Sequence, residues 1–220
     1  MSGMKANLVN SRRVTTVHNL LAGSKKKVKG TGNQIQYGTA LVKKSTLRIN
    51  GSDNIIVLGD RSRLAGVKIT IQGDNHTLVI GPDVRMNNLE IAFEDSGCEI
   101  SIGEATTIDG GHVAAAEPGS RITIGSGCMF SRGIHIVTTD SHSILDQETR
   151  DRINPARDVE IGDHVWVGSF AKILKGAVLH SGCIIGLGAV VTGVVDSNTV
   201  VAGNPSRVVK RNVDWSRARI

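Results

Sequence analysis

From residue 161 onward, apolar residues return every six positions, through the phrases IGDHVW, VGSFAK, ILKGAV, LHSGCI, IGLGAV and VTGVVD. The first position always holds an aliphatic residue: Ile161, Val167, Ile173, Leu179, Ile185 and Val191. The fifth position holds a smaller apolar residue: Val165, Ala171, Ala177, Cys183, Ala189 and Val195. A period of six is not the 3.6 of an α-helix, but it is a multiple of the strand period of two. The pattern therefore predicts short strands of one length, each followed by a turn.

A second, longer period runs through the first half of the chain. Gly59, Gly81, Gly103 and Gly125 are spaced by 22 residues and close the runs NIIVLG, TLVIG, EISIG and RITIG. Together the two periods predict an all-β solenoid, a parallel β-helix whose stacked coils share an aliphatic core that no single coil could bury alone. In this fold Cys183, and Cys128 in ITIGSGCM, fill small slots under corners and need no chemical role.

The regular pattern suggests three parts. Residues 31–205 are expected to form the β-helix, and the charged stretch 138–158, which lacks the hexad, is expected to project from it as a loop. Residues 1–30 form a basic segment, partly helical if Leu8, Val14, Val17, Leu20 and Leu21 share one face. Within it, KKKVK (25–29) is interpreted as a solvated linker, with contact to an anionic substrate or lipid as the alternative. Residues 206–220 form a tail, in which a short basic helix is predicted after Asn204-Pro205.

Composition narrows the class of protein. The 220 residues fit one domain or one repeat array, and the net charge of +6 favours anionic partners, with plain solubility as the alternative. No nucleic-acid-binding motif is present, so nucleic acid is not expected as a partner. Three cysteines do not make a disulfide framework, and no run of 18 apolar residues occurs. The chain is expected to be cytoplasmic, without a membrane span.

The hexads, the phrase IGDHVWVG, the closing TVVAGNPSRVVK and above all DSHSILD…RINPARDVEIGDHVWVG carry a family resemblance. Over residues 130 to 212 the chain resembles the hexapeptide-repeat acyltransferases, and most of all the sugar and polysaccharide O-acetyltransferases. The resemblance implies a left-handed β-helix, whereas the general rule for parallel crossovers would give a right-handed one. It also implies acetyl-CoA as co-substrate, a glycan or sugar acceptor, no metal, and a homotrimer with active sites between subunits.

The resemblance singles out His142 as the catalytic residue, a general base that takes a proton from an acceptor hydroxyl. Imidazole suits this task because its unperturbed pKa, about 6.5, lies near working pH. Asp140 and Asp146 could orient His142, although solvation of the loop is the favoured explanation of both carboxylates.

The resemblance also assigns residues to the two substrates. On the acetyl-CoA side it points to Trp166, Gly168, Ser169, Leu187, Thr192, Arg207 and Lys210, with Arg207 and Lys210 placed to meet the phosphates. His112 and His135 are candidates for the acceptor side, because both could approach the same cleft.

Two other classes of function stay open at this point. A γ-type carbonic anhydrase would need three histidines that hold zinc, and His112, His135 and His142 are the only plausible trio. A non-catalytic β-helix scaffold would bind no CoA. Stoichiometric zinc would favour the first alternative, and a melting temperature unmoved by CoA would favour the second.

Overall fold

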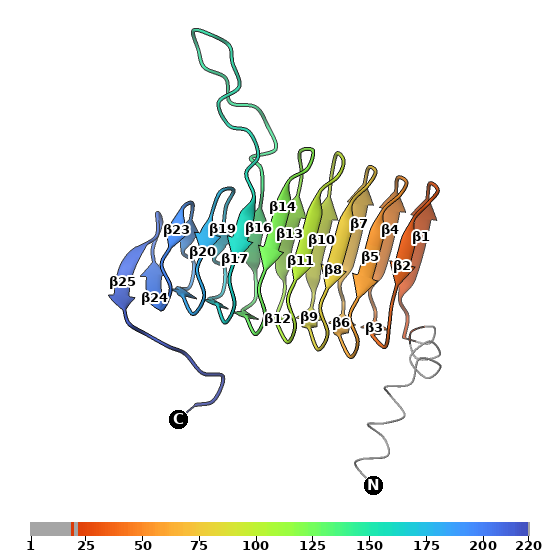
Figure 1. The fold of residues 1–220 in the computed structure, drawn as a ribbon, viewed down its shortest axis with the longest axis horizontal. Helices are drawn as coiled ribbons and strands as arrows, with labels where there is room; N and C mark the ends of the chain where they lie inside the picture. The colour runs from red at the N-terminus through yellow and green to blue at the C-terminus, as the bar shows by residue number, and fades with distance from the viewer. Residues whose placement is uncertain (1–18, 20–21, 220) are drawn as a thin grey trace.

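The chain winds into a solenoid of stacked coils, each of which contributes one strand to each of three parallel sheets (Figure 1). The structure is a computed structural model that describes residue 19 and residues 22–219. One long loop leaves the solenoid between β16 and β17, and the carboxyl-terminal tail leaves after β25. No helix in this described part is long and apolar enough to cross a membrane.

The strands alternate among the three sheets in chain order, A then B then C. Sheet A contains β1 (Lys25–Lys29), β4 (Thr46–Asn50), β7 (Lys68–Gln72), β10 (Leu89–Phe93), β13 (Gly111–Ala115), β16 (Ile134–Val137), β19 (Lys172–Ile173) and β22 (Val190–Val191). Sheet B contains β2 (Gln34–Gln36), β5 (Ile55–Leu58), β8 (Thr77–Ile80), β11 (Glu99–Ile102), β14 (Arg121–Ile124), β17 (Val159–Ile161), β20 (Val178–Leu179) and β23 (Val194–Val195). Sheet C contains β3 (Leu41–Lys43), β6 (Arg63–Ala65), β9 (Arg85–Asn87), β12 (Thr107–Ile108), β15 (Met129–Phe130), β18 (Trp166–Val167), β21 (Ile184–Ile185), β24 (Thr199–Ala202) and β25 (Arg207–Arg211).

The two sequence periods correspond to two sizes of coil. In sheet A, Lys68 pairs with Glu90 and Glu90 with His112, in steps of 22 residues. Later in the same sheet Lys172 pairs with Val190, a step of 18 residues, or three hexads. The early coils have strands of up to five residues, whereas the hexad coils have strands of two. Both sizes keep the parallel ladder because each coil stacks residue on residue.

Aliphatic side chains fill the interior of the solenoid. All twelve residues at the first and fifth hexad positions are buried, and so are Cys128 and Cys183, which confirms their structural interpretation. The period-22 glycines stack directly on one another at the turn from sheet B to sheet C. A Cβ on Gly59 would lie 2.4 Å from the carbonyl carbon of Gly81, so only glycine permits this stacking.

Buried polar side chains link neighbouring coils at the turn from sheet A to sheet B. The side-chain oxygen of Asn54 accepts the backbone N–H of His76 at 2.9 Å, and Nδ1 of His76 accepts the N–H of Cys98 at 3.1 Å. Burial lowers the pKa of His76 below its ordinary value, so the neutral imidazole that accepts this bond is favoured.

Two boundaries differ from the sequence prediction. The solenoid begins with β1, so KKKVK is an edge strand paired with β4 rather than a linker ahead of the domain. Residues 207–211 form β25, antiparallel to β24, and the predicted short carboxyl-terminal helix is wrong. The open edge of β24 supplies backbone partners that a sequence pattern does not reveal. The apolar positions of the predicted amino-terminal helix lie outside the described residues.

Candidate functional site

The loop of residues 138–158 projects from the turn between sheets A and B (Figure 1). Its two legs pair with each other: the N–H of Ile153 donates to the carbonyl oxygen of Ile144 at 2.9 Å, and Leu145 bridges Arg152. The coil closes beneath the loop, because His135 of β16 still pairs with Lys172 of β19 across the insertion. The loop is therefore an ordered excursion on an uninterrupted scaffold.

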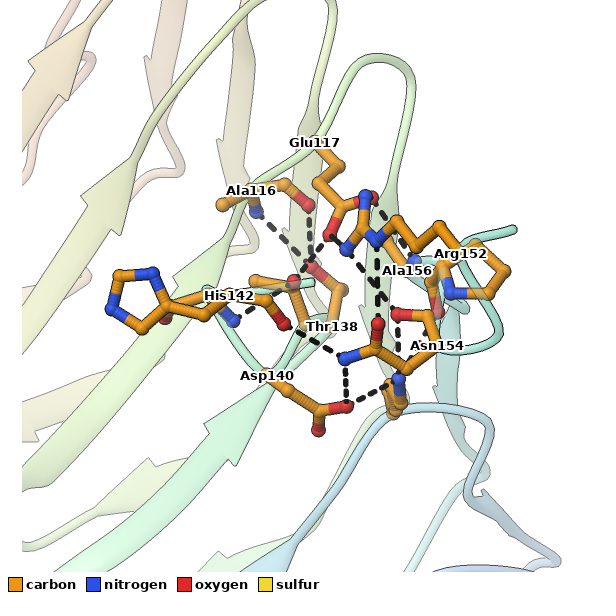
Figure 2. Close-up of polar contacts among 12 residues, drawn as sticks. Ala116, Glu117, Thr138, Asp140, His142, Arg152, Asn154 and Ala156 are labelled. Atoms are coloured by element: carbon orange, nitrogen blue, oxygen red, sulfur yellow. Dashed lines mark hydrogen bonds and ion pairs between the residues drawn. The ribbon is translucent and has the colours of Figure 1, made fainter. Parts of the chain in front are cut away.

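Glu117, in the turn between β13 and β14, holds the base of the loop (Figure 2). Its carboxylate accepts two hydrogen bonds from the Arg152 guanidinium, at 2.5 and 2.8 Å, one from Thr139 Oγ1 at 2.5 Å, and one from the N–H of Ala156 at 3.2 Å. These donors, Arg152 first, lower the pKa of Glu117 to about 2. The carboxylate is thus ionised and fully occupied at neutral pH.

Asn154 is a second fastening point, and it is buried. Its amide nitrogen donates to the carbonyl oxygen of His142 and to Asp140 Oδ2, both at 2.9 Å, while its amide oxygen accepts the N–H of Ile144 at 2.6 Å. Lys175, from the next coil, forms an ion pair with Asp140 at 2.6 Å and lowers the pKa of that carboxyl. The backbone on both sides of residue 142 is therefore fixed.

His142 presents its imidazole away from this network (Figure 2). The backbone N–H of His142 donates to the carbonyl oxygen of Asp140 at 2.8 Å, so the backbone is engaged while the side chain is exposed. Within the described residues neither predicted orienting carboxylate contacts the ring. Asp140 is engaged by Lys175 and Asn154, and Asp146 accepts the N–H groups of Glu148 and Thr149 in a turn at the loop tip.

His112 and His135 lie side by side on the outer face of sheet A, with ring centroids 5.3 Å apart and planes inclined by 17°. Both line a cavity of 480 Å³ that also contacts Asp140 and Ser141 at the base of the loop. Burial, helped by the nearby charge of His112 and of Lys172, lowers the pKa of His135. The structure thus brings the two predicted acceptor-side histidines together, next to the loop that carries His142.

Most of the predicted acetyl-CoA residues lie in two parallel rows on sheet C. In the first row, Trp166 pairs with Ile184, Ile184 with Val200, and Val200 with Lys210. In the second row, Gly168 stacks on Gly186, Gly186 on Ala202, and Ala202 pairs with Arg207. Arg207 and Lys210 are therefore three strand spacings from the tryptophan end, about 14 Å away.

The remaining predicted residues divide between two corners. Ser169 and the largely exposed Leu187 lie where sheet C turns into sheet A, and the carbonyl oxygen of Ser169 accepts the N–H of Gly188 at 2.9 Å. Thr192 lies apart from them, because it follows β22 where sheet A turns into sheet B. In one chain Thr192 is therefore on the side of the loop, across sheet A from the two rows.

The tail after β25 contains a residue that the sequence pattern did not single out. Trp215 is buried: its ring stacks on His164 with centroids 4.2 Å apart, and its Nε1 donates to the carbonyl oxygen of His164 at 2.8 Å. The ring also lies 6.2 Å from that of Trp166. The signal was a large aromatic residue in a short tail that contains few other large apolar residues. Glu117, Asn154 and Lys175 were missed as well, although Asn154 lies within the phrase RINPARD.

Within a single chain the candidate parts do not meet. His142 is at the edge of sheet A that leads to sheet B, whereas Gly168 and Ser169 are at the edge that comes from sheet C. His142 also does not line the cavity of His112 and His135. In the described part of one chain, no three His, Cys, Asp or Glu side chains are grouped as a metal site would require.

Comparison with known proteins identifies the family. Residues 158–193 match the model described as bacterial transferase hexapeptide (six repeats). Two solved structures match almost the whole chain. The polySia-specific acetyltransferase NeuO is 31% identical with a TM-score of 0.81, over 89% of this chain and 90% of its own. The polysialic acid O-acetyltransferase OatWY is 33% identical with a TM-score of 0.85, over 90% and 92%.

The chain belongs to the hexapeptide-repeat acyltransferases. Its solenoid is accordingly the left-handed parallel β-helix that the resemblance implied. Among curated sequences, a polysialic acid O-acetyltransferase of Escherichia coli O1:K1 is 37% identical over 90 residues. That match covers 41% of this chain and only 29% of the relative. Membership in the hexapeptide-repeat acyltransferases therefore rests on the whole-chain structural matches rather than on this shorter one.

Proposed function

We propose that the protein is an O-acetyltransferase that moves an acetyl group from acetyl-CoA to a hydroxyl of a polysaccharide. One observation carries this proposal: the exposed imidazole of His142 stands on a braced loop of a solenoid that matches two polysialic acid acetyltransferases along nine tenths of the chain. An acidic polysaccharide is the favoured acceptor, which also agrees with the net charge of +6. A cytoplasmic location stays a prediction.

In the proposed reaction, His142 acts as general base. Its neutral imidazole takes the proton of the acceptor hydroxyl while the oxygen attacks the thioester carbonyl of acetyl-CoA. The tetrahedral intermediate collapses, the carbon–sulfur bond breaks, and the departing thiolate of CoA takes the proton back from the imidazolium. An ester and a free thiol result, with no covalent enzyme intermediate. The fixed backbone at His142 supplies the positioning that such a transfer needs.

The two rows of sheet C fit an elongated ligand with phosphates at one end. Trp166 offers an apolar wall, Gly168 allows close approach of a ligand to the backbone, and Arg207 and Lys210 offer two exposed cations. Phosphate groups form strong charge-assisted hydrogen bonds with such side chains. We therefore propose that acetyl-CoA lies along these rows, with its phosphates near β25.

The site would be completed by a second copy of the chain. Because sheet A separates His142 from the two rows in one chain, the imidazole of one subunit would serve acetyl-CoA bound to its neighbour. A homotrimer with three interfacial sites is the proposed assembly. Mixed oligomers test this arrangement. Co-expressed His142→Ala and Arg207→Ala/Lys210→Ala chains, assayed at low acetyl-CoA, should exceed the mean activity of the two separate variants. Activity equal to that mean would show that each chain works alone.

The acceptor and the activity are tested together by a transfer screen. Purified protein is incubated with acetyl-CoA and acidic polysaccharides, neutral polysaccharides or single sugars, and free thiol is measured with wild type and His142→Ala in parallel. Thiol release that depends on an acidic polysaccharide and on His142 is expected. No acceptor-dependent release from any sugar, or equal release by both proteins, would overturn the proposal.

A further inference from the structure

The first three coils present a cationic surface on sheet A. Alternation of the strands places nine side chains of β1, β4 and β7 on the outer face: Lys25, Lys27, Lys29, Thr46, Arg48, Asn50, Lys68, Thr70 and Gln72. Five of these nine carry a positive charge, and none carries a negative charge. We call this set of nine positions the cationic face.

Most of the positive charges on the cationic face are available to a partner. Within the described residues, Lys25, Lys27, Lys29 and Arg48 form no ion pair, and all four are exposed. Only Lys68 is paired, with Glu90 of the following coil at 2.6 Å. Lys27 and Arg48 are register partners on adjacent strands, so their side chains stand about 4.8 Å apart along the solenoid.

Other faces of the same coils differ. On sheet B the outer positions of β2, β5 and β8 are Gln34, Gln36, Ile55, Val57, Thr77 and Val79, with no charge at all. On sheet C, Lys43, Arg63 and Arg85 also face outward, and within the described residues none of the three forms an ion pair. Sheets A and C are thus both cationic in these coils, but the cavity of His112 and His135 lies on sheet A.

The cationic face leads along one sheet to the cavity of His112 and His135. In the outer column that begins with Lys27 and Arg48, the side chains shrink to Ala92 and Ala114, and these alanines line the cavity. The cavity in turn contacts the base of the loop of residues 138–158. From β1 to β13 there are four strand spacings, about 19 Å, a length that several sugar residues of an extended glycan would occupy.

We propose that the cationic face is a binding surface for the part of an acidic polysaccharide acceptor that extends beyond the reacting sugar. This inference rests on the proposed function, with the reacting sugar beside the cavity of His112 and His135, where Asp140 and Ser141 lead to His142. The carboxylates of the distant sugars pair with Lys25, Lys27, Lys29 and Arg48, so the enzyme recognises a polyanionic chain rather than one sugar. Because the contacts are exposed, they are weak singly, additive along the chain and screened by salt.

The test compares acidic oligosaccharides of increasing length. With wild type, KM should fall as a polysialic acid oligomer lengthens and level off once it spans the face, with kcat nearly constant. The variant Lys25→Gln/Lys27→Gln/Arg48→Gln should raise KM for long oligomers about tenfold at low ionic strength. Its KM for the shortest acceptor that is acetylated should stay unchanged, as should its KM for acetyl-CoA. High salt should abolish the difference from wild type.

A matched control removes the same charge from another face. Lys43→Gln/Arg63→Gln/Arg85→Gln also removes three positive charges, all on sheet C, and should leave the length dependence intact. Equal effects of both variants, or no length dependence in wild type, would overturn the proposal while the transfer activity itself stood. Failure of the proposed function is distinguishable, because no acceptor of any length would then release thiol.

An anionic membrane is a second possible partner of the cationic face. A binding experiment without acetyl-CoA distinguishes it from an acidic polysaccharide. Wild type should bind immobilised polysialic acid in a salt-dependent manner, and the sheet A variant should bind about tenfold less well. Neutral dextran should retain neither protein. If the sheet A variant keeps its polysialic acid binding but no longer binds phosphatidylglycerol vesicles that retain wild type, the face serves a membrane surface and the proposal is wrong.

Discussion

Glu117 and Arg152 are joined by two hydrogen bonds of 2.5 and 2.8 Å between residues 35 positions apart in the chain. Glu117 belongs to a turn of the solenoid and Arg152 to the projecting loop, so this pair fastens the loop to the scaffold. Thr139 and Ala156 add two further donors to the same carboxylate, one from each leg near the loop base. The position of His142 thus depends on a residue of another coil.

Replacing Glu117 by Gln should lower kcat about tenfold, because an uncharged amide cannot hold the guanidinium and both other donors at once. The melting temperature should change little, since the solenoid core is untouched. Combining the variant with Arg152→Gln in a double-mutant cycle should give a total loss smaller than the product of the single losses. Independent, multiplying effects would show that the pair does not act as a unit.

The same carboxylate predicts a pH response of the loop. The folded pKa of Glu117 is about 2, below its ordinary value of 4.5, so its stabilising effect is complete above pH about 4.5 and declines as pH falls towards 2. The protection of the amides of residues 138–158 against hydrogen exchange, corrected for the pH dependence of the intrinsic rate, should decrease over that range in wild type. The Glu117→Gln protein should already exchange fast at neutral pH. An unchanged loop exchange rate in the variant would contradict this assignment.

The His142→Ala protein should bind acetyl-CoA and melt like wild type, yet turn over roughly 10²–10⁴ times more slowly. Within the described part of the chain the imidazole forms no hydrogen bond or ion pair, so we expect its loss to remove proton transfer alone. Asp146→Asn is a matched loop control, because that carboxylate serves only the turn at the tip. Near-normal turnover of His142→Ala would remove this residue from the catalytic role.

The cations of β25 should act on acetyl-CoA and not on the acceptor. Arg207→Ala and Lys210→Ala should each raise the KM for acetyl-CoA several-fold, and added salt should reduce the effect, because the contacts with phosphate are exposed. Arg121→Ala, on sheet B, is the control and should leave this KM unchanged. If the KM for acetyl-CoA is insensitive to both β25 variants, the phosphates bind elsewhere.

Gly168 offers a test of how tightly neighbouring coils pack against each other. A Cβ there would lie 2.8 Å from the backbone nitrogen of Leu187 and 2.9 Å from the carbonyl oxygen of Ile185. Gly168→Ala should therefore push two coils apart and lower the free energy of unfolding by about 1–3 kcal/mol. Gly193→Ala, where no atom lies within 4 Å of the added methyl group, should be neutral. Calorimetry of both variants decides, and equal stability would show that the coils adjust freely.

The sequence predicted the coils well because their cause is local. A hexad with an aliphatic first position and a small fifth position specifies strand, turn and core at once, so residues 161–195 could be interpreted from spacing alone. His142 was singled out by the family resemblance, within a loop that breaks that regularity. The contacts that hold the loop were not predicted. Glu117 lies more than twenty residues before the loop, and an isolated glutamate has no periodic signal. Residues 207–211 were misjudged because their structure depends on the free edge of β24, a tertiary feature.

His135 pairs with Lys172 although 36 residues lie between them, so the loop is an insertion that does not change the register of the ladder beneath it. The projecting loop and the ladder beneath it are thus encoded in separate segments of the chain. A loop of another length or composition could be grafted between β16 and β17 without re-registering a single strand. The segment that carries His142 can therefore vary in such a molecule, while the stacked coils keep the stability that tolerates the change.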